Sequence, residues 1–187
     1  MTALSNLSLP LLLVLALGGP AWSAEPVFSL TITGPSGPVE AGADIQLKVT
    51  LTNVSDHYVQ THYANTDQAE WQYDVDFRGP DGKEPAKTKD YRDAFRSVRL
   101  DKPLSEADRK ADEKDYPQGP PTPGPYFLGS RGIAGFELGG SRTNYLNLSK
   151  LYDLSKAGKY TVQVSHEDAT GTNSVVKSNV FVVTIKK

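Results

Sequence analysis

Apolar and polar residues alternate along much of this 187-residue chain, which is the pattern of β-strands with one buried face. Residues 28–33 (FSLTIT) place Phe, Leu and Ile on one face and Ser and Thr on the other. Residues 45–52 (IQLKVTLT) show the most regular alternation, and residues 71–77 (WQYDVDF) follow the same pattern. The next residues, 79–82 (GPDG), predict a turn because proline presets φ and glycine tolerates a positive φ.

Further β-patterned runs occupy residues 145–148, 160–164 and 180–185. Apart from one insertion, described next, the mature chain has no long run with the 3.6-residue period of a helix. The sequence therefore predicts the all-β class, and an antiparallel β-sandwich is the architecture that these short strands favour.

A long insertion, at about residues 83–140, is predicted to interrupt the strands as an irregular segment. Residues 78–115 hold 11 Lys/Arg and 10 Asp/Glu, which is half of the 42 charges of the chain. Residues 105–114 (SEADRKADEK) allow a short exposed helix with Ser105 as its N-cap and Asp108 in the third helical position. Few apolar residues support this helix. A loop of this length is either functional or poorly ordered, and the composition favours poor order over residues 100–125.

The most specific segment is 148–162, where a strand is predicted to enter one helical turn before Gly158 reverses the chain. Gly158 followed two residues later by Tyr160 resembles the tyrosine corner of immunoglobulin-like sandwiches. The resemblance implies that the Tyr160 hydroxyl forms a hydrogen bond with a backbone group before Gly158. It also implies that Val162 lies where antibody domains carry their second cysteine.

The segment Leu138-Gly139-Gly140-Ser141 resembles the Leu-x-Pro-Gly-Glu turn of exported bacterial immunoglobulin-like domains. The chain is also similar to proteinase-inhibitor-like bacterial sandwiches and to the β-sandwich region of deuterolysin-type proteases. These resemblances cover residues 28–52 and 136–185. They imply an immunoglobulin-like antiparallel β-sandwich and bring no catalytic residue with them.

The amino-terminal residues predict a signal peptide over residues 1–23. Residues 7–17 (LSLPLLLVLAL) form an uncharged apolar run that is too short to span a membrane, and Ala21 and Ser23 favour cleavage after Ser23. A buried amino-terminal helix is the alternative. We therefore expect an exported protein, secreted or periplasmic, whose residues 24–187 form a single domain.

Composition excludes several classes of function. The net charge of −2 gives no basic surface for nucleic acid, and the absence of cysteine excludes disulfides, zinc–thiolate sites and a cysteine nucleophile. No Gly-x-Ser-x-Gly motif occurs, and the glycine-rich segment 129–140 precedes a predicted strand rather than the helix of a phosphate-binding loop. We expect no cofactor and no stable membrane insertion after cleavage.

Histidines and paired aspartates are the only candidates for metal or acid–base chemistry: His57, His62, Asp74, Asp76 and His166. Asp74 and Asp76 share one face of a predicted strand, about 7 Å apart. Such a pair can bind calcium or act as an acid and a base. The alternative interpretation is a polar outer face that keeps an edge strand from pairing, together with solvent-facing loop histidines.

Aromatic residues in predicted loops are the candidates for a binding surface: Tyr58, Tyr63, Tyr116, Tyr126 and Phe127. The alternative is that they cover the ends of the core. Two hypotheses for the function follow. The first is a monomeric, non-catalytic immunoglobulin-like module that binds a protein, peptide or glycan; the second is a metal-dependent or acid–base hydrolase that uses Asp74, Asp76 and the histidines.

Overall fold

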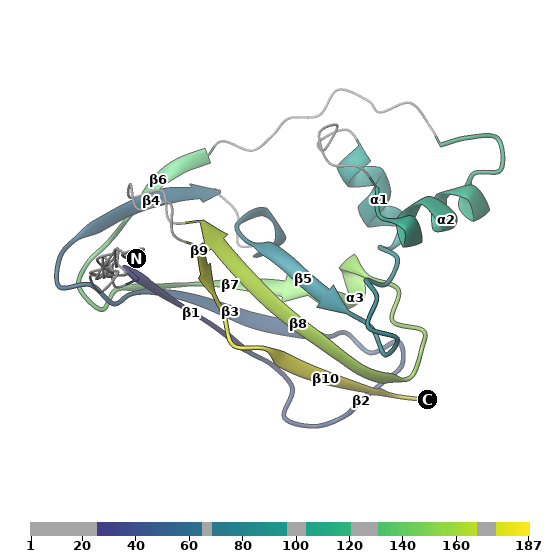
Figure 1. Ribbon diagram of the computed structural model, residues 1–187, viewed down its shortest axis with the longest axis horizontal. Coiled ribbons are helices and arrows are strands. Elements are labelled where there is room, and N and C mark those ends of the chain that lie inside the picture. Colours follow the sequence, from purple (N-terminus) through teal and green to yellow (C-terminus); the bar gives the residue numbers. More distant parts are fainter. Residues whose placement is uncertain (1–25, 65–68, 97–103, 121–130, 168–174) are drawn as a thin grey trace, which may run out of the picture.

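A computed structural model of the chain describes residues 26–64, 69–96, 104–120, 131–167 and 175–187 (Figure 1). The predicted signal peptide, Tyr126 and Phe127 lie outside the described residues. The strands are β1 Phe28–Thr33, β2 Val39–Glu40, β3 Gln46–Asn53, β4 Val59–Ala64, β5 Asp74–Arg78, β6 Arg131–Phe136, β7 Ser141–Asn147, β8 Gly158–Glu167, β9 Val175–Lys177 and β10 Phe181–Lys186. The helices are η1 Ala69–Trp71 (3₁₀), α1 Lys89–Arg96, α2 Glu106–Asp115 and α3 Leu148–Leu151.

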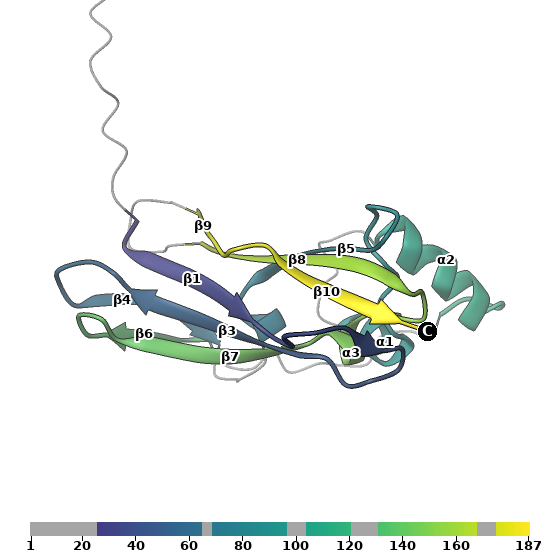
Figure 2. The ribbon, with the colours of Figure 1, turned by 90° about the horizontal axis from the view of Figure 1, so that it is seen from below.

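The protein is mostly β, with 46% strand and 17% helix, which confirms the predicted class. Three strands form an antiparallel sheet in the order β1-β3-β7. A second sheet has the order β2-β10-β8-β5, with β2 parallel to β10 and with β9 also paired to β8. Strands β4 and β6 pair with each other as a two-stranded ribbon, and Figure 2 shows the two larger sheets as separate layers.

The alternation in the sequence places one face of each sheet in a shared apolar core. Phe28, Leu30 and Ile32 are buried on β1, as are Leu47, Val49 and Leu51 on β3. From the second sheet, β8 and β10 contribute Tyr160, Val162, Val164, Val183 and Ile185. The strands predicted at 28–33 and 45–52 are therefore confirmed, because the period-2 pattern is itself the signal of a half-buried strand.

The strand predicted over 71–77 begins later than expected. Residues Ala69–Trp71 form a 3₁₀ turn in which the backbone N–H groups of Gln72 and Tyr73 donate to the Ala69 carbonyl. Strand β5 then starts at Asp74, and Phe77 is buried. Ala69 is fully buried, so the turn is fixed by packing at a residue that the alternating pattern does not include.

The chain reversal at Tyr160 has the predicted hydrogen bond. The Tyr160 hydroxyl donates to the Lys156 carbonyl at 2.7 Å, and Gly158 adopts φ +145°. The Tyr160 ring is stacked on Phe77 with 5.5 Å between ring centroids, and Phe77 also lies 4.5 Å from the ring of Tyr152. These three rings anchor α3 and the start of β8 to β5.

The insertion differs from the irregular segment that the sequence predicts at about 83–140. It contains the helices α1 and α2 and the strand β6, which pairs with β4 from Val59↔Phe136 to Ala64↔Arg131. Poor order over 100–125 is wrong for residues 104–120, where α2 is formed; residues 100–103 and 121–125 lie outside the described part of the chain. The physical reason for the order of α2 is a set of buried ion pairs that Arg92 and Lys87 form with its carboxylates.

Candidate binding cleft

Helix α2 starts where its capping residues predict. Ser105 has extended backbone angles, and its Oγ accepts from the Asp108 backbone N–H at 3.1 Å. The helix is not an exposed one, however: Asp108 and Asp112 are buried, at 2% and 6% exposure. Since Asp108, Asp112 and Asp115 lie at i, i+4 and i+7, one helical face presents three carboxylates.

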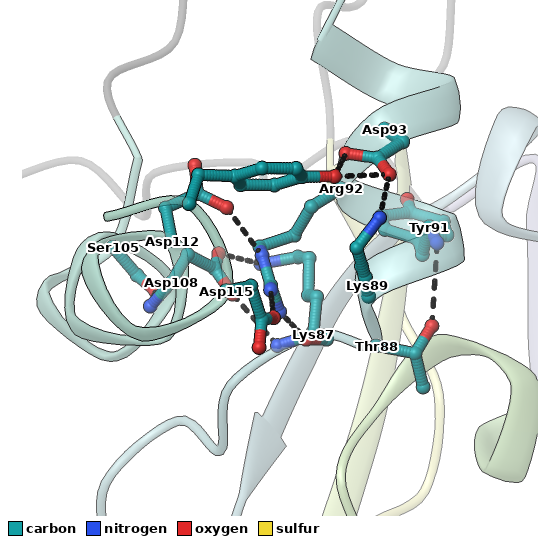
Figure 3. A network of polar contacts seen from close by, with 11 residues as sticks. Lys87, Thr88, Lys89, Tyr91, Arg92, Asp93, Ser105, Asp108, Asp112 and Asp115 are labelled. Carbon is teal, nitrogen blue, oxygen red and sulfur yellow. Dashed lines mark hydrogen bonds and ion pairs between the residues drawn. The ribbon is translucent and has the colours of Figure 1, made fainter. Parts of the chain in front are cut away.

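Arg92 on α1 forms ion pairs with the carboxylate face of α2. Its side chain is only 3% exposed, and Nε donates to Asp112 Oδ1 at 2.7 Å. The remaining guanidinium nitrogens donate to Asp115 and to the Lys87 carbonyl. Figure 3 shows Arg92 between the two helices with these partners around it. A guanidinium buried to this extent is stable only when its donors are paired, and here each of its three nitrogens has a partner.

Lys87 forms a second buried contact, with Asp108. Its backbone N–H donates to Asp108 Oδ1 at 2.6 Å and its Nζ to Asp108 Oδ2 at 3.0 Å. The same Nζ donates to Glu84 at 2.8 Å. Asp108 therefore fixes both the backbone before α1 and the first turn of α2.

A third contact joins the ends of the two helices. The Tyr116 hydroxyl donates to Asp93 at 2.6 Å, and Lys89 Nζ donates to the same carboxylate at 2.8 Å. The hydrogen bond from Lys89 to Asp93 raises the pKa of Lys89, and its contact with Tyr116 adds to the effect. Tyr116, which the sequence predicts as part of a binding surface, is half-buried, and its bond to Asp93 holds α2 against α1.

The segment before α1 is attached to the β-sheet body through α3. The backbone N–H of Thr88 donates to the Leu151 carbonyl, and that of Asp153 donates to the Ala86 carbonyl. The Thr88 hydroxyl donates to the Lys150 carbonyl at 2.6 Å. Tyr152, between these contacts, is buried, and burial together with nearby acidic groups raises the pKa of its hydroxyl.

This arrangement leaves an open cleft of about 780 Å³ between the helices and the body, which we call the helical cleft. Its lining includes Ala43, Ala86, Ala111, Lys114, Leu154 and Ser155. A neighbouring cleft of about 590 Å³, beside the turn at residues 79–82, shares Ala86, Ala111, Lys114 and Ser155 with it. Long side chains such as Lys89, Asp115 and Tyr152 line the cleft beside the small ones. An open cleft of this kind is suited to an extended ligand rather than to a buried small molecule.

The predicted metal and acid–base residues are not brought together. His57 is exposed and pairs with Asp56 at 2.9 Å, and His62 is exposed on β4. His166 is buried on β8, with Nε2 3.2 Å from Thr61 Oγ1 and its ring edge-on to Phe28 and Tyr73. Within the described part of the chain, no group of three or more His, Cys, Asp or Glu side chains could hold a metal ion.

Asp74 and Asp76 lie on the exposed face of β5, which ends its sheet in the described residues. Asp76 forms an ion pair with Arg78 at 2.6 Å. This is the arrangement expected of a polar outer face on an edge strand. The histidines lie on other elements, so the side chains of the hydrolase hypothesis do not converge on one site.

The predicted aromatic surface is also divided. Tyr58 is 51% exposed and lies over Gly135 of β6, where a Cβ atom would come within 2.0 Å of its hydroxyl. Tyr63 belongs to β4 and not to a loop, because residues 59–64 pair with β6. Tyr116 follows the last residue of α2, and α2 lies at the opposite end of the molecule from β4 and β6 (Figures 1 and 2). The described members therefore do not form one surface.

The residues that build the helical cleft were not among the sequence candidates. The sequence signal that could have identified them is the i, i+4, i+7 spacing of Asp108, Asp112 and Asp115. This spacing places carboxylates, instead of apolar side chains, along the buried face of a helix.

No protein-family model matches this chain, and no curated protein matches it in sequence. None of the helices in the described ranges has the length and apolar character needed to cross a membrane.

Proposed function

We propose that this protein is an exported, non-catalytic binding module with an immunoglobulin-like β-sandwich, and that the helical cleft holds an extended peptide segment of a partner protein. Export follows from the predicted leader at residues 1–23. A cysteine-free domain can fold outside the cytoplasm without disulfides because its core of large apolar side chains is sufficient to stabilise it.

Strand order supports the immunoglobulin-like part of the proposal. In such sandwiches strands A, B and E are neighbours in one sheet, and G, F and C are neighbours in the other. The orders β1-β3-β7 and β10-β8-β5 correspond to these two sets, taken in chain order. The hydrogen bond of Tyr160 lies at the start of β8, which corresponds to strand F, where the tyrosine corner occurs.

One observation carries the proposed binding role: buried ion pairs fix α1 and α2 beside an open cleft. Burying charges is costly, and an apolar contact of the same size stabilises a fold as well or better. Arg92 with Asp112, and Lys87 with Asp108, instead specify one orientation of the two helices, because these bonds are directional. A cleft with fixed walls binds a ligand without the entropy cost of ordering them.

The chemistry of the cleft favours a peptide segment as the ligand. Ala43, Ala86 and Ala111 offer shallow apolar walls, and Lys114 supplies a cation at the rim that makes no ion pair with any described residue. An extended chain with small side chains and an acidic group matches these features.

A cleft-filling variant tests the proposal. Ala111→Trp places a large ring in the cleft, whereas Glu113→Trp places the same ring on the exposed face of the same helix. We expect proteins cross-linked to the native protein in its own compartment to be recovered with Glu113→Trp and lost with Ala111→Trp. Equal recovery with both variants would exclude the cleft as the site. Absence of any cross-linked partner of the native protein would contradict the binding function itself.

A further inference from the structure

The outer face of the sheet β1-β3-β7 carries hydroxyl groups in register across all three strands. The pairing aligns Ser29 with Thr52 and Ser141, and it aligns Thr31 with Thr50 and Thr143. A third row consists of Thr33, Lys48 and Tyr145. We call these nine residues the hydroxyl face.

The rows are regular because strand geometry sets their spacing. Adjacent strands lie about 4.8 Å apart, and residues two apart along a strand lie about 6.7 Å apart on the same face. In the central row, the Thr50 and Thr143 hydroxyl oxygens are 3.4 Å from each other. All nine side chains are exposed or half-buried, so the hydroxyl face is accessible as far as the described residues determine.

Among the nine residues of the hydroxyl face, Lys48 is the only one with a charged side chain. The phenol of Tyr145 is the only other ionisable group. Protein surfaces usually carry charges of both signs in about a quarter to a third of positions. The outer face of the other sheet follows that rule, with Asp74, Asp76 and Arg78 on β5 and Lys159 on β8. The two faces come from the same fold and the same half-buried strands, so strand formation alone does not require the loss of charge.

A surface of this chemistry is suited to a ligand that is itself neutral and rich in hydroxyls. Each Ser or Thr hydroxyl both donates and accepts, so it can pair with a sugar hydroxyl in either direction. With few ions on the face, little charge has to be desolvated when a ligand binds. Tyr145, in the third row, is 46% exposed, and its ring can stack on the C–H face of a pyranose.

We propose that the hydroxyl face binds a neutral polysaccharide chain, separately from the peptide segment assigned to the helical cleft. The three rows allow a short run of sugar units to lie across the strands, because the width of a pyranose ring is close to the strand spacing. Tyr145, at the end of β7, marks one edge of this site. The two sites lie on different elements, so either can be disabled without the other.

Co-sedimentation with insoluble neutral polysaccharides tests the proposal. The protein, expressed from the full chain, is mixed in turn with cellulose, chitin, β-1,3-glucan and starch granules. We expect the native protein to sediment with at least one of them. Thr50→Lys puts a charge in the central row, and Thr161→Lys puts the same charge on the outer face of the other sheet, also on a central strand. We expect Thr50→Lys and Tyr145→Ala to weaken binding at least tenfold, and Thr161→Lys to bind as the native protein does.

Urea melts of the variants verify that each is folded before binding is compared. Failure of the native protein to sediment with all four polysaccharides would overturn the proposal, and so would native-like binding by folded Thr50→Lys. Ala111→Trp, which fills the helical cleft, should sediment as the native protein does. The two proposals can therefore fail separately.

Discussion

The β-sheet body and the two-helix unit are held together by opposite kinds of interaction. Between the sheets the largest fully buried side chains are Tyr160, Phe28 and Phe77, followed by aliphatic residues. In α1 and α2 the buried side chains among those described are Arg92, Asp108 and Asp112. The body is stabilised by apolar burial, which is not directional. The helical unit is stabilised by ion pairs, which are directional.

This contrast shows how a highly charged segment becomes ordered. Half of the charges of the chain lie in residues 78–115, and that composition by itself favours disorder. Pairing Arg92 with Asp112 and Asp115, and Lys87 with Asp108, removes charges from water only in combinations that satisfy them. The ion pairs therefore fix the position of α1 and α2, and substitutions of the paired residues are poorly tolerated.

Phe77→Ala should have the largest effect, because it removes the ring between Tyr152 and Tyr160. Phe77 is 1% exposed, and truncating a buried phenylalanine costs about 3–5 kcal/mol. Urea unfolding should show the whole body destabilised in one transition. A cost below about 1 kcal/mol would mean that the aromatic cluster is not the anchor of the body.

Arg92→Met should cost about 3 kcal/mol, since it removes the buried cation that donates to the buried Asp112. We expect the loss to be local, with faster amide exchange in α1 and α2 and unchanged exchange in β3 and β8. The double variant Arg92→Met with Asp112→Leu should recover most of the stability, because neither buried charge then remains. If the amide protons of β8 lost as much protection from exchange as those of α1 and α2, the body and the helical unit would unfold together.

Gly158→Val should destabilise the body by at least about 2 kcal/mol, because backbone strain and overpacking each cost about 1–3 kcal/mol. Gly158 has φ +145°, and a Cβ atom there would come within 2.5 Å of Pro80 Cγ. The urea midpoint measures the effect. A native midpoint would contradict the requirement for glycine at this reversal.

Tyr160→Phe keeps the ring stacked on Phe77 and removes only the hydroxyl that donates to Lys156. Losing one hydrogen bond that leaves a partly buried acceptor costs about 1–3 kcal/mol. The same urea titration should therefore rank this variant below Phe77→Ala and above a surface substitution. Stability equal to the native protein would contradict a structural role for this hydrogen bond.

The sequence predicted those parts of the fold whose signals are local. Alternation over Phe28, Leu30 and Ile32 identified β1, and the Ser105 cap identified the first residue of α2. The corner hydrogen bond of Tyr160 was predicted because donor and acceptor are four residues apart. Each of these features depends on neighbours along the chain.

Features that depend on distant partners could not be predicted in the same way. Helix α1 has few apolar residues, and it is held by bonds from Arg92 to carboxylates twenty or more residues away. His57, His62 and His166 were candidate metal ligands, but His57 lies in the bend before β4, His62 is exposed on β4 and His166 is buried on β8. The rows of the hydroxyl face appear only when the register of β1, β3 and β7 is known.

Lys110→Ala should have the smallest effect, although it lies on α2 between Asp108 and Asp112 in sequence. Its side chain is 64% exposed, and its ion pair with Glu106 at 2.7 Å joins two solvated groups one helical turn apart. Such pairs contribute little, so the free energy of unfolding should change by less than about 0.5 kcal/mol. Amide exchange in α2 should also match that of the native protein. A loss comparable to that of Arg92→Met would show that exposed charges, and not the buried ones, fix the helical unit, and it would reverse the contrast with the body.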